Sequence, residues 1–284
     1  MVFRFLATVH MGLFRFTTKI KYHSSQDVSY EYYLGKDYRE TYKPPQGNGV
    51  VPTIISNHVS IFDNHAMGAI FKGNACFAAA SFIKNLPFIG TCCTAFGSVY
   101  ISRAATKEKL EQAMDELTRR ALLNEEKGIF PPSVIYPEGT TSNNICLMKF
   151  RRGAFFAMRQ VQPVTLKYRF ENVSPAIEAM DEFMLIMLMS MSLQKNVLEV
   201  NVLPPFQPNE YLLKTHRDKV KGKEDWEVFA WACRDIMAKV GKFGKSDIDF
   251  AQRIAAYNYL TKKSPTYEVS KEQVELLNKH KKEN

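Results

Sequence analysis

The 284-residue sequence lacks any sign of a disulfide framework. Its five cysteines are an odd number and form no Cys-x-x-Cys pair, so we expect reduced thiols on the cytosolic side. Zinc-finger spacing is absent, and so is any arginine-rich or RNP-like run. These absences argue against nucleic acid as a partner.

An apolar run long enough to cross a membrane is not evident either. The stretch FMLIMLMSMSL, residues 183–193, is apolar all round but has only eleven residues, whereas a spanning helix needs about 20. It predicts a buried core helix, a segment partly immersed in lipid, or the wall of a slot for a long chain. Its four methionines make a deformable surface, and the sequence leaves the three alternatives open.

The N-terminal sequence MVFRFLATVHMGLFRFTTKI is not a signal peptide, because His10 and Arg15 interrupt it and no small-residue cleavage site follows. Helical spacing instead gives it one apolar face and one polar, cationic face. The apolar face comprises Val2, Leu6, Val9, Leu13, Phe16 and Ile20, and the opposite face comprises Arg4, Thr8, Arg15 and Lys19. Such a helix lies flat in a lipid interface or packs its stripe on the protein's own core.

The net charge is +9, from 38 basic and 29 acidic residues. This excess suits an anionic partner such as an acidic membrane face or a phosphorylated small molecule, and it also fits an ordinary solvated surface. The last four residues, KKEN, resemble the dilysine signal that returns membrane proteins to the endoplasmic reticulum. If the protein binds membranes, we expect it on the cytosolic face of that organelle.

The order of predicted elements indicates an α/β fold, a central mixed sheet flanked by helices. Strands are expected at VVPTIIS, SVIYPEG, VQPVTLKY and VLEVNVL, and helices from Thr106 to Gly128 and from Trp226 to Val240. We divide the chain into an N-terminal amphipathic, membrane-interacting segment (1–45), a domain that carries the candidate site (46–243) and a basic C-terminal tail (244–284).

The stretch IISNHVSIFDNH, residues 54–65, ends a buried strand with a histidine, and Asp63 follows His58 by five residues. In one continuous helix this separation would hold the side chains about 140° apart. They can meet if His58 lies on a strand-to-helix turn and Asp63 lies in the first helical turn. A carboxylate bound to one ring nitrogen leaves the other free to take a proton, as a general base does. A histidine that only caps the helix is the alternative.

A second strand ends in VIYPEGTTSN, residues 134–143. Glu138 is unusual there unless it is paired or binds substrate hydroxyls, and Gly139 allows backbone N–H groups to close on an anion. The strand GSVYISR ends with Arg103, which binds phosphate in a bidentate manner or forms a surface ion pair. A basic cluster follows the glycine turn: Lys149, Arg151 and Arg152.

Four motifs now stand in order: NHVSIFD, GSVYISR, YPEGTTSN and VQPV. In order and spacing they resemble the four motifs of the glycerolipid acyltransferase superfamily, the 1-acylglycerol-3-phosphate acyltransferase-like enzymes, over about residues 50–168. The segments NNICLMKFRRGAFF and LEVNVLPPFQP look most like the lysophosphatidylcholine acyltransferase branch. The resemblance implies an α/β catalytic domain with a membrane-associated N-terminal helical element.

The resemblance also implies a role for each matching residue. His58 would deprotonate the glycerol hydroxyl of the acceptor, Asp63 would hold His58, and the hydroxyl would attack the acyl-CoA thioester directly. The acceptor and its phosphate would be bound by Arg103, Glu138, Gly139, Thr140 and Thr141. Support for the acyl-CoA or phosphate groups is expected from Asn57, Lys149, Arg151, Arg152 and Pro163.

No metal and no cofactor are implied, because acyl-CoA serves as co-substrate. The implied partners are the lipid bilayer, acyl-CoA and a lysophospholipid. Many phosphatidate-forming relatives carry an arginine where this chain has Thr141, and this difference favours an acceptor with a head group on its phosphate over lysophosphatidate. Alternatives are a glycerol-3-phosphate acyltransferase and a catalytically silent membrane lipid-binding protein. A hydrolase would need a G-x-S-x-G elbow, which the sequence lacks.

Overall fold

The computed structural model describes residues 8–9, 11–41, 51–71, 75–85, 89–95, 97–102, 106–176, 192–222 and 224–260. The strands are β1 (Phe16–Tyr22), β2 (Thr53–Ser56), β3 (Cys76–Ala80), β4 (Val99–Ile101), β5 (Ser133–Ile135), β6 (Cys146–Leu147), β7 (Val161–Phe170), β8 (Asn196–Val202) and β9 (Gly244–Lys245). The α-helices are α2 (Glu31–Leu34), α3 (Tyr38–Thr41), α4 (Asp63–Ile70), α5 (Ile89–Ala95), α6 (Lys107–Lys127), α8 (Glu210–Thr215), α9 (Asp225–Gly241) and α10 (Phe250–Leu260).

Seven of the strands form one mixed sheet in the order β1-β8-β7-β2-β5-β3-β4. The pairing of β7 with β8 is antiparallel, and the other neighbours in this sheet are parallel. Since β2, β5 and β7 are parallel, their carboxyl ends lie at one edge of the sheet. The motifs NHVSIFD and YPEGTTSN, which follow β2 and β5, therefore lie at the same edge, whereas VQPV forms the first four residues of β7 beside β2.

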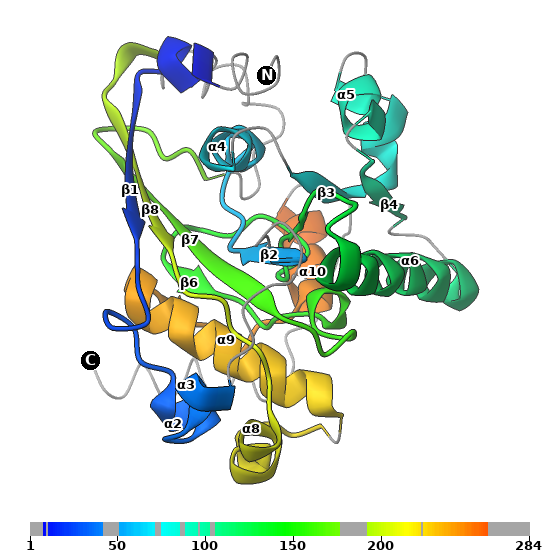
Figure 1. The fold of residues 1–284 in the computed structure, drawn as a ribbon. Coiled ribbons are helices and arrows are strands. Elements are labelled where there is room, and N and C mark those ends of the chain that lie inside the picture. Colours follow the sequence, from blue (N-terminus) through cyan, green and yellow to red (C-terminus); the bar gives the residue numbers. More distant parts are fainter. Residues whose placement is uncertain are drawn as a thin grey trace.

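Helices cover both faces of the sheet (Figure 1). Ile54 and Ile55 are neighbours on β2, so their side chains point to opposite faces. Ile54 belongs to the apolar cluster of α4, and Ile55 belongs to the cluster of α9. The predicted α/β class, a mixed sheet flanked by helices, is thus confirmed.

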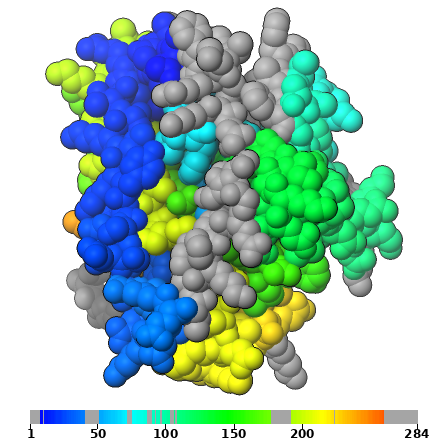
Figure 2. Space-filling view, in the orientation of Figure 1, coloured from blue at the N-terminus to red at the C-terminus, as the bar shows by residue number. Residues whose placement is uncertain are grey.

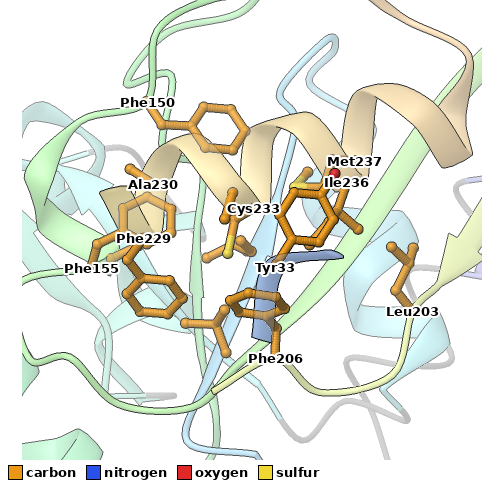
Figure 3. Close-up of a cluster of buried hydrophobic side chains, with 14 of the residues drawn as sticks. Tyr33, Phe150, Phe155, Leu203, Phe206, Phe229, Ala230, Cys233, Ile236 and Met237 are labelled. Carbon is orange, nitrogen blue, oxygen red and sulfur yellow. The ribbon is translucent and has the colours of Figure 1, made fainter. Parts of the chain in front are cut away.

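The larger cluster is built on α9, whose apolar residues recur with helical spacing. Phe229 lies between Phe155 and Phe206, with ring centroids 5.1 and 5.9 Å away. Figure 3 shows Phe229 and Cys233 pointing from α9 into this cluster. The helix begins with a capping box formed by Glu224 and Glu227, which satisfies backbone N–H groups at its first turn.

Two predicted elements agree closely with the structure. Helix α6 ends where the sequence predicts, at Gly128, which adopts a left-handed conformation (φ 61°) as the C-cap. Strand β8 alternates buried and partly exposed residues along its whole length. Between β6 and β7 the chain forms a 3₁₀ turn, Arg152–Ala154.

The N-terminal prediction needs correction. Residues 8–9 and 11–13 are helical, but Phe16 and Ile20 lie on strand β1, which pairs with β8 from Phe16 to Tyr22. The backbone N–H and C=O groups of this segment therefore form hydrogen bonds within the sheet instead of within a longer helix. Strand β1 runs along one side of the molecule (Figure 2), so residues 16–22 are part of the main sheet.

Residues that follow position 244, where the basic tail is predicted to begin, contact the rest of the molecule. Strand β9 pairs with β6, and Phe250 at the start of α10 lies 4.4 Å from the Arg151 guanidinium carbon. Residues 244–260 thus belong to the same body as the candidate site. Within the described residues, no helix has the length and hydropathy of a membrane span. Residues 183–191 and the KKEN tail lie outside the described residues.

Candidate active site

The candidate site begins at the carboxyl end of β2. Residues 57–60 leave the strand as a turn, and α4 begins at Asp63. The Asp63 carboxylate folds back over this turn, where Oδ2 accepts hydrogen bonds from the backbone N–H groups of Val59 (2.6 Å) and Ser60 (3.0 Å). This short turn brings the side chains of His58 and Asp63 together, although the two residues are five positions apart.

The same carboxylate oxygen binds the imidazole of His58. The distance from Nδ1 to Asp63 Oδ2 is 2.7 Å, and the exposed fraction of the side chain is 22% for His58 and 0% for Asp63. An ionised carboxylate can only accept hydrogen bonds, so Nδ1 carries the proton and Nε2 carries a lone pair. The predicted pairing is therefore confirmed, and the arrangement can remove a proton from a substrate hydroxyl.

Two other side chains hold the backbone of His58. Its N–H donates to Glu138 Oε1 (3.1 Å), and its carbonyl accepts from the backbone N–H (2.7 Å) and the hydroxyl (3.1 Å) of Ser142. The imidazole also stacks on the Tyr136 ring, with centroids 4.1 Å apart and planes 14° apart. The Tyr136 hydroxyl donates to Asn64 Oδ1 at 2.9 Å. His58 is thus fixed at its backbone, at Nδ1 and on one face of its ring.

Glu138 follows the first of its two expected alternatives, because both of its carboxylate oxygens are paired with backbone N–H groups. It is fully buried, and its second oxygen, Oε2, accepts from the Met148 backbone N–H at 2.9 Å. Burial raises the pKa of Glu138 to about 7, although the backbone donors of Met148 and His58 favour the ionised form. Through its two oxygens, Glu138 therefore connects the turn at His58 to the backbone of Met148.

Asn57 differs from its predicted role in substrate support. Its amide donates to the Leu166 carbonyl and its amide oxygen accepts from the Leu166 N–H, both at 2.8 Å, and it is 1% exposed. Both polar groups of the side chain serve β7. Asn57 thus fastens the His58 turn to that strand.

Tyr168 is a residue that the sequence analysis missed. Its hydroxyl donates to Asp63 Oδ1 at 2.5 Å. Burial and the negative charge of Asp63 raise the pKa of Tyr168 well above its ordinary value, so the phenol keeps its proton. The only sequence signal is the alternation Val164, Leu166, Tyr168, which puts this ring on the α4 face of β7.

The glycine turn lies beside a cation, as predicted. Gly139 has φ +74°, and a Cβ added there would lie 3.0 Å from both Cδ and Nη1 of Arg151. The Arg151 backbone N–H donates to the Pro137 carbonyl at 2.8 Å, and its guanidinium lies over the Phe250 ring. Because glycine has no side chain, it permits this close approach.

The positions of the other residues predicted to bind substrate say less about their roles. Thr140 and Thr141 are partly exposed beyond the glycine turn, and Lys149 and Arg152 are exposed. Arg152 stacks on the Phe156 ring at 3.9 Å. Pro163 is buried within β7 opposite Ile55, and Arg103 lies outside the described residues. Their roles in binding stay predictions. Among the described residues, no three metal-ligating side chains cluster.

An α/β domain with an oriented histidine at the carboxyl edge of its sheet carries the side chains that a transferase needs for general-base catalysis. Comparison with known proteins agrees with the four motifs. Residues 36–167, a little under half of the chain, match the family model described as Acyltransferase.

The similar proteins include the lysophospholipid acyltransferase LPEAT1 of Arabidopsis thaliana, 29% identical over 70% of this chain and 47% of that protein. Lysophosphatidylcholine acyltransferase 1 of Danio rerio is 32% identical over 59% of this chain and 30% of its own length. The chain spans less than half the length of these curated relatives. A solved structure, the 1-acyl-sn-glycerophosphate acyltransferase PlsC of Thermotoga maritima, gives a TM-score of 0.48 at 12% identity, over 85% of this chain and 77% of that one.

Proposed function

We propose that this protein transfers a fatty acyl chain from acyl-CoA to the glycerol hydroxyl of a lysophospholipid. The observation that carries the proposal is the His58–Asp63 pair. Its carboxylate is fully buried, and its imidazole is partly exposed and held at Nδ1. This geometry supports the role of His58 as a base for an incoming hydroxyl, and the match to the Acyltransferase family model supports the reaction class.

The reaction proceeds by direct attack. His58 Nε2 takes the proton of the acceptor hydroxyl while its oxygen forms a bond to the thioester carbonyl carbon. Asp63 stays ionised and stabilises the imidazolium. The tetrahedral intermediate then collapses, the carbon–sulfur bond breaks, and the imidazolium returns the proton to the departing CoA thiolate. No acyl-enzyme is formed, and the side chains require no metal for these steps.

The acceptor site is proposed to lie at the glycine turn. Arg151 lies against Gly139, and with Arg103 it supplies positive charge for the acceptor phosphate. The neutral Thr141 favours a phosphodiester, as in lysophosphatidylcholine or lysophosphatidylethanolamine. Glycerol 3-phosphate is a secondary candidate as acceptor.

We propose that the protein works on the cytosolic face of the endoplasmic reticulum membrane. The support is an apolar N-terminal surface, where Leu13 is 68% exposed and Val9 is 42% exposed. Both belong to the stripe expected to lie in a lipid interface. The choice of organelle is supported by the resemblance of the KKEN sequence at residues 281–284 to a dilysine signal.

His58→Ala tests the mechanism. Loss of a general base should lower the rate of transfer by about 10²–10⁴-fold, while membrane binding survives. The assay uses radiolabelled acyl-CoA with lysophosphatidate, lysophosphatidylcholine, lysophosphatidylethanolamine and glycerol 3-phosphate as acceptors. The control is His65→Ala, which removes another histidine of the same segment and should retain transfer.

The outcomes separate the candidate functions. Undiminished transfer by His58→Ala rejects the proposed mechanism. A wild-type protein that binds lipid vesicles but acylates none of the four acceptors is instead a silent lipid-binding protein. A preference for glycerol 3-phosphate identifies the alternative acyltransferase.

A further inference from the structure

We infer that Tyr168 is a positioning residue of the reaction proposed above, which holds Asp63 in its ionised form and so keeps His58 ready to accept a proton. Asp63 is fully buried, and an ionised carboxylate in such a place needs donors on both oxygens. Oδ2 has three donors, from His58, Val59 and Ser60. Oδ1 depends on the Tyr168 hydroxyl, since no second donor reaches it from the described residues.

The structure holds Tyr168 in place from its backbone. Strand β2 pairs with β7 only as far as Val164, so the edge of β7 beyond that point needs other partners for its N–H and C=O groups. The Asn57 amide serves Leu166. Two residues further on, Asn144 donates to the Tyr168 carbonyl (2.8 Å) and accepts from its N–H (3.0 Å).

This arrangement links the acceptor loop to the catalytic pair. Asn144 follows the YPEGTT sequence and adopts a left-handed conformation, φ 62°. Because Asn144 binds the backbone of Tyr168, the position of that loop determines where the Tyr168 hydroxyl meets Asp63 Oδ1. The Tyr168 ring also packs edge-on against Phe16 of β1, with centroids 5.7 Å apart. The phenol is therefore held by three different parts of the chain.

The expected effect of losing the Tyr168 hydrogen bond follows from the charge of the His58–Asp63 pair. With His58 neutral, the His58–Asp63 pair carries one negative charge, and proton uptake makes the pair neutral. A hydrogen bond from Tyr168 stabilises the negative state more than the neutral one, so its loss makes the pair take up a proton at higher pH. The other ionisable groups that face the pair are Tyr136, stacked on the imidazole, and Glu138, bonded to the His58 N–H; Arg151 lies beyond at Gly139.

Tyr168→Phe removes the hydroxyl and keeps the ring. In the full chain with lipid, kcat/KM for acyl transfer is measured against pH and compared with wild type. The acid limb of the variant should move up by about one pH unit, since a hydrogen bond to a charged group has that order of effect. At a pH below the limb, the variant should be about tenfold slower.

Tyr30→Phe is the matched control. Tyr30 is also 2% exposed, and its hydroxyl donates to the Pro204 carbonyl at 2.7 Å, so its loss tests the cost of any buried tyrosine hydroxyl. Tyr30→Phe should lose stability without moving the acid limb. An acid limb of Tyr168→Phe that coincides with that of wild type would overturn the inference.

A second measurement is independent of activity. The six histidines are labelled with ¹⁵N, and the His58 signal is identified by its loss in His58→Gln. The NMR titration midpoint of His58 should rise in Tyr168→Phe by about the same amount, one pH unit, and an unchanged midpoint would refute the role. If wild type transfers no acyl group, the proposed function fails, and this titration still decides the role of Tyr168.

Discussion

The buried carboxyl group of Glu138 should make the stability of this protein depend on pH. Burial raises its pKa from 4.5 to about 7 in the folded state. Between these values the unfolded chain binds fewer protons than the folded one, so the free energy of unfolding falls as the pH rises. One pH unit corresponds to about 1.36 kcal/mol. The free energy of unfolding should therefore fall by about 3 kcal/mol between pH 4.5 and pH 7 because of Glu138 alone, with little further change above pH 7.

Glu138→Gln isolates this contribution, because an amide does not ionise. The amide also places an N–H group against one of two backbone donors, His58 or Met148, which should cost about 1–3 kcal/mol. At about pH 5 the wild type should therefore be the more stable protein. The difference should shrink or reverse toward pH 8, because only the wild type loses stability from Glu138.

Urea unfolding, followed by tryptophan fluorescence at several values of pH, measures this difference. Glu116→Gln is the control, because the Arg119 hydrogen bond lowers the pKa of Glu116 to about 2. Glu116 is thus ionised in both states above about pH 5, and its substitution should give an offset that does not vary with pH. If the offset of Glu138→Gln is equally constant, the reasoning about Glu138 is wrong.

Two further substitutions test how the site is held. Asn57→Ala leaves the Leu166 N–H and C=O without the side chain that serves them, so urea unfolding should show a loss of about 2–4 kcal/mol; a loss below about 0.5 kcal/mol, as at an ordinary surface position, would contradict the role of this amide. Gly139→Ala puts a methyl group at φ +74° and 3.0 Å from Arg151, which should cost about 1–2 kcal/mol and raise the acceptor KM in the acyl-transfer assay, and an unchanged KM would show that the acceptor does not use this turn.

The contact between His58 and Asp63 could be predicted because its determinants are local. His58 and Asp63 are five residues apart, and one strand-to-helix turn brings them together. Helix α6 could be predicted for the same reason, since its apolar spacing and Gly128 lie within one segment. Each of these features depends on few residues beyond itself.

The contacts that the sequence could not predict depend on distant partners. Asn57 and Glu138 look like ligand-binding side chains until the Leu166 and Met148 backbone groups are seen to occupy them. Tyr168 gives no sign of its contact with a carboxylate 105 positions earlier. The apolar spacing of residues 16–20 fits a helix, and only the partner strand β8 makes them a strand.

The pairing of β1 with β8 also bears on how the protein is made. Phe16 pairs with Asn196, about 180 residues later. At a ribosomal rate of 5–20 residues per second, roughly 10–40 s separate the synthesis of these two strands. During that interval the first strand of the sheet has no partner, while the apolar residues that precede it have already left the ribosome. The nascent chain can therefore reach a lipid surface before its sheet is complete.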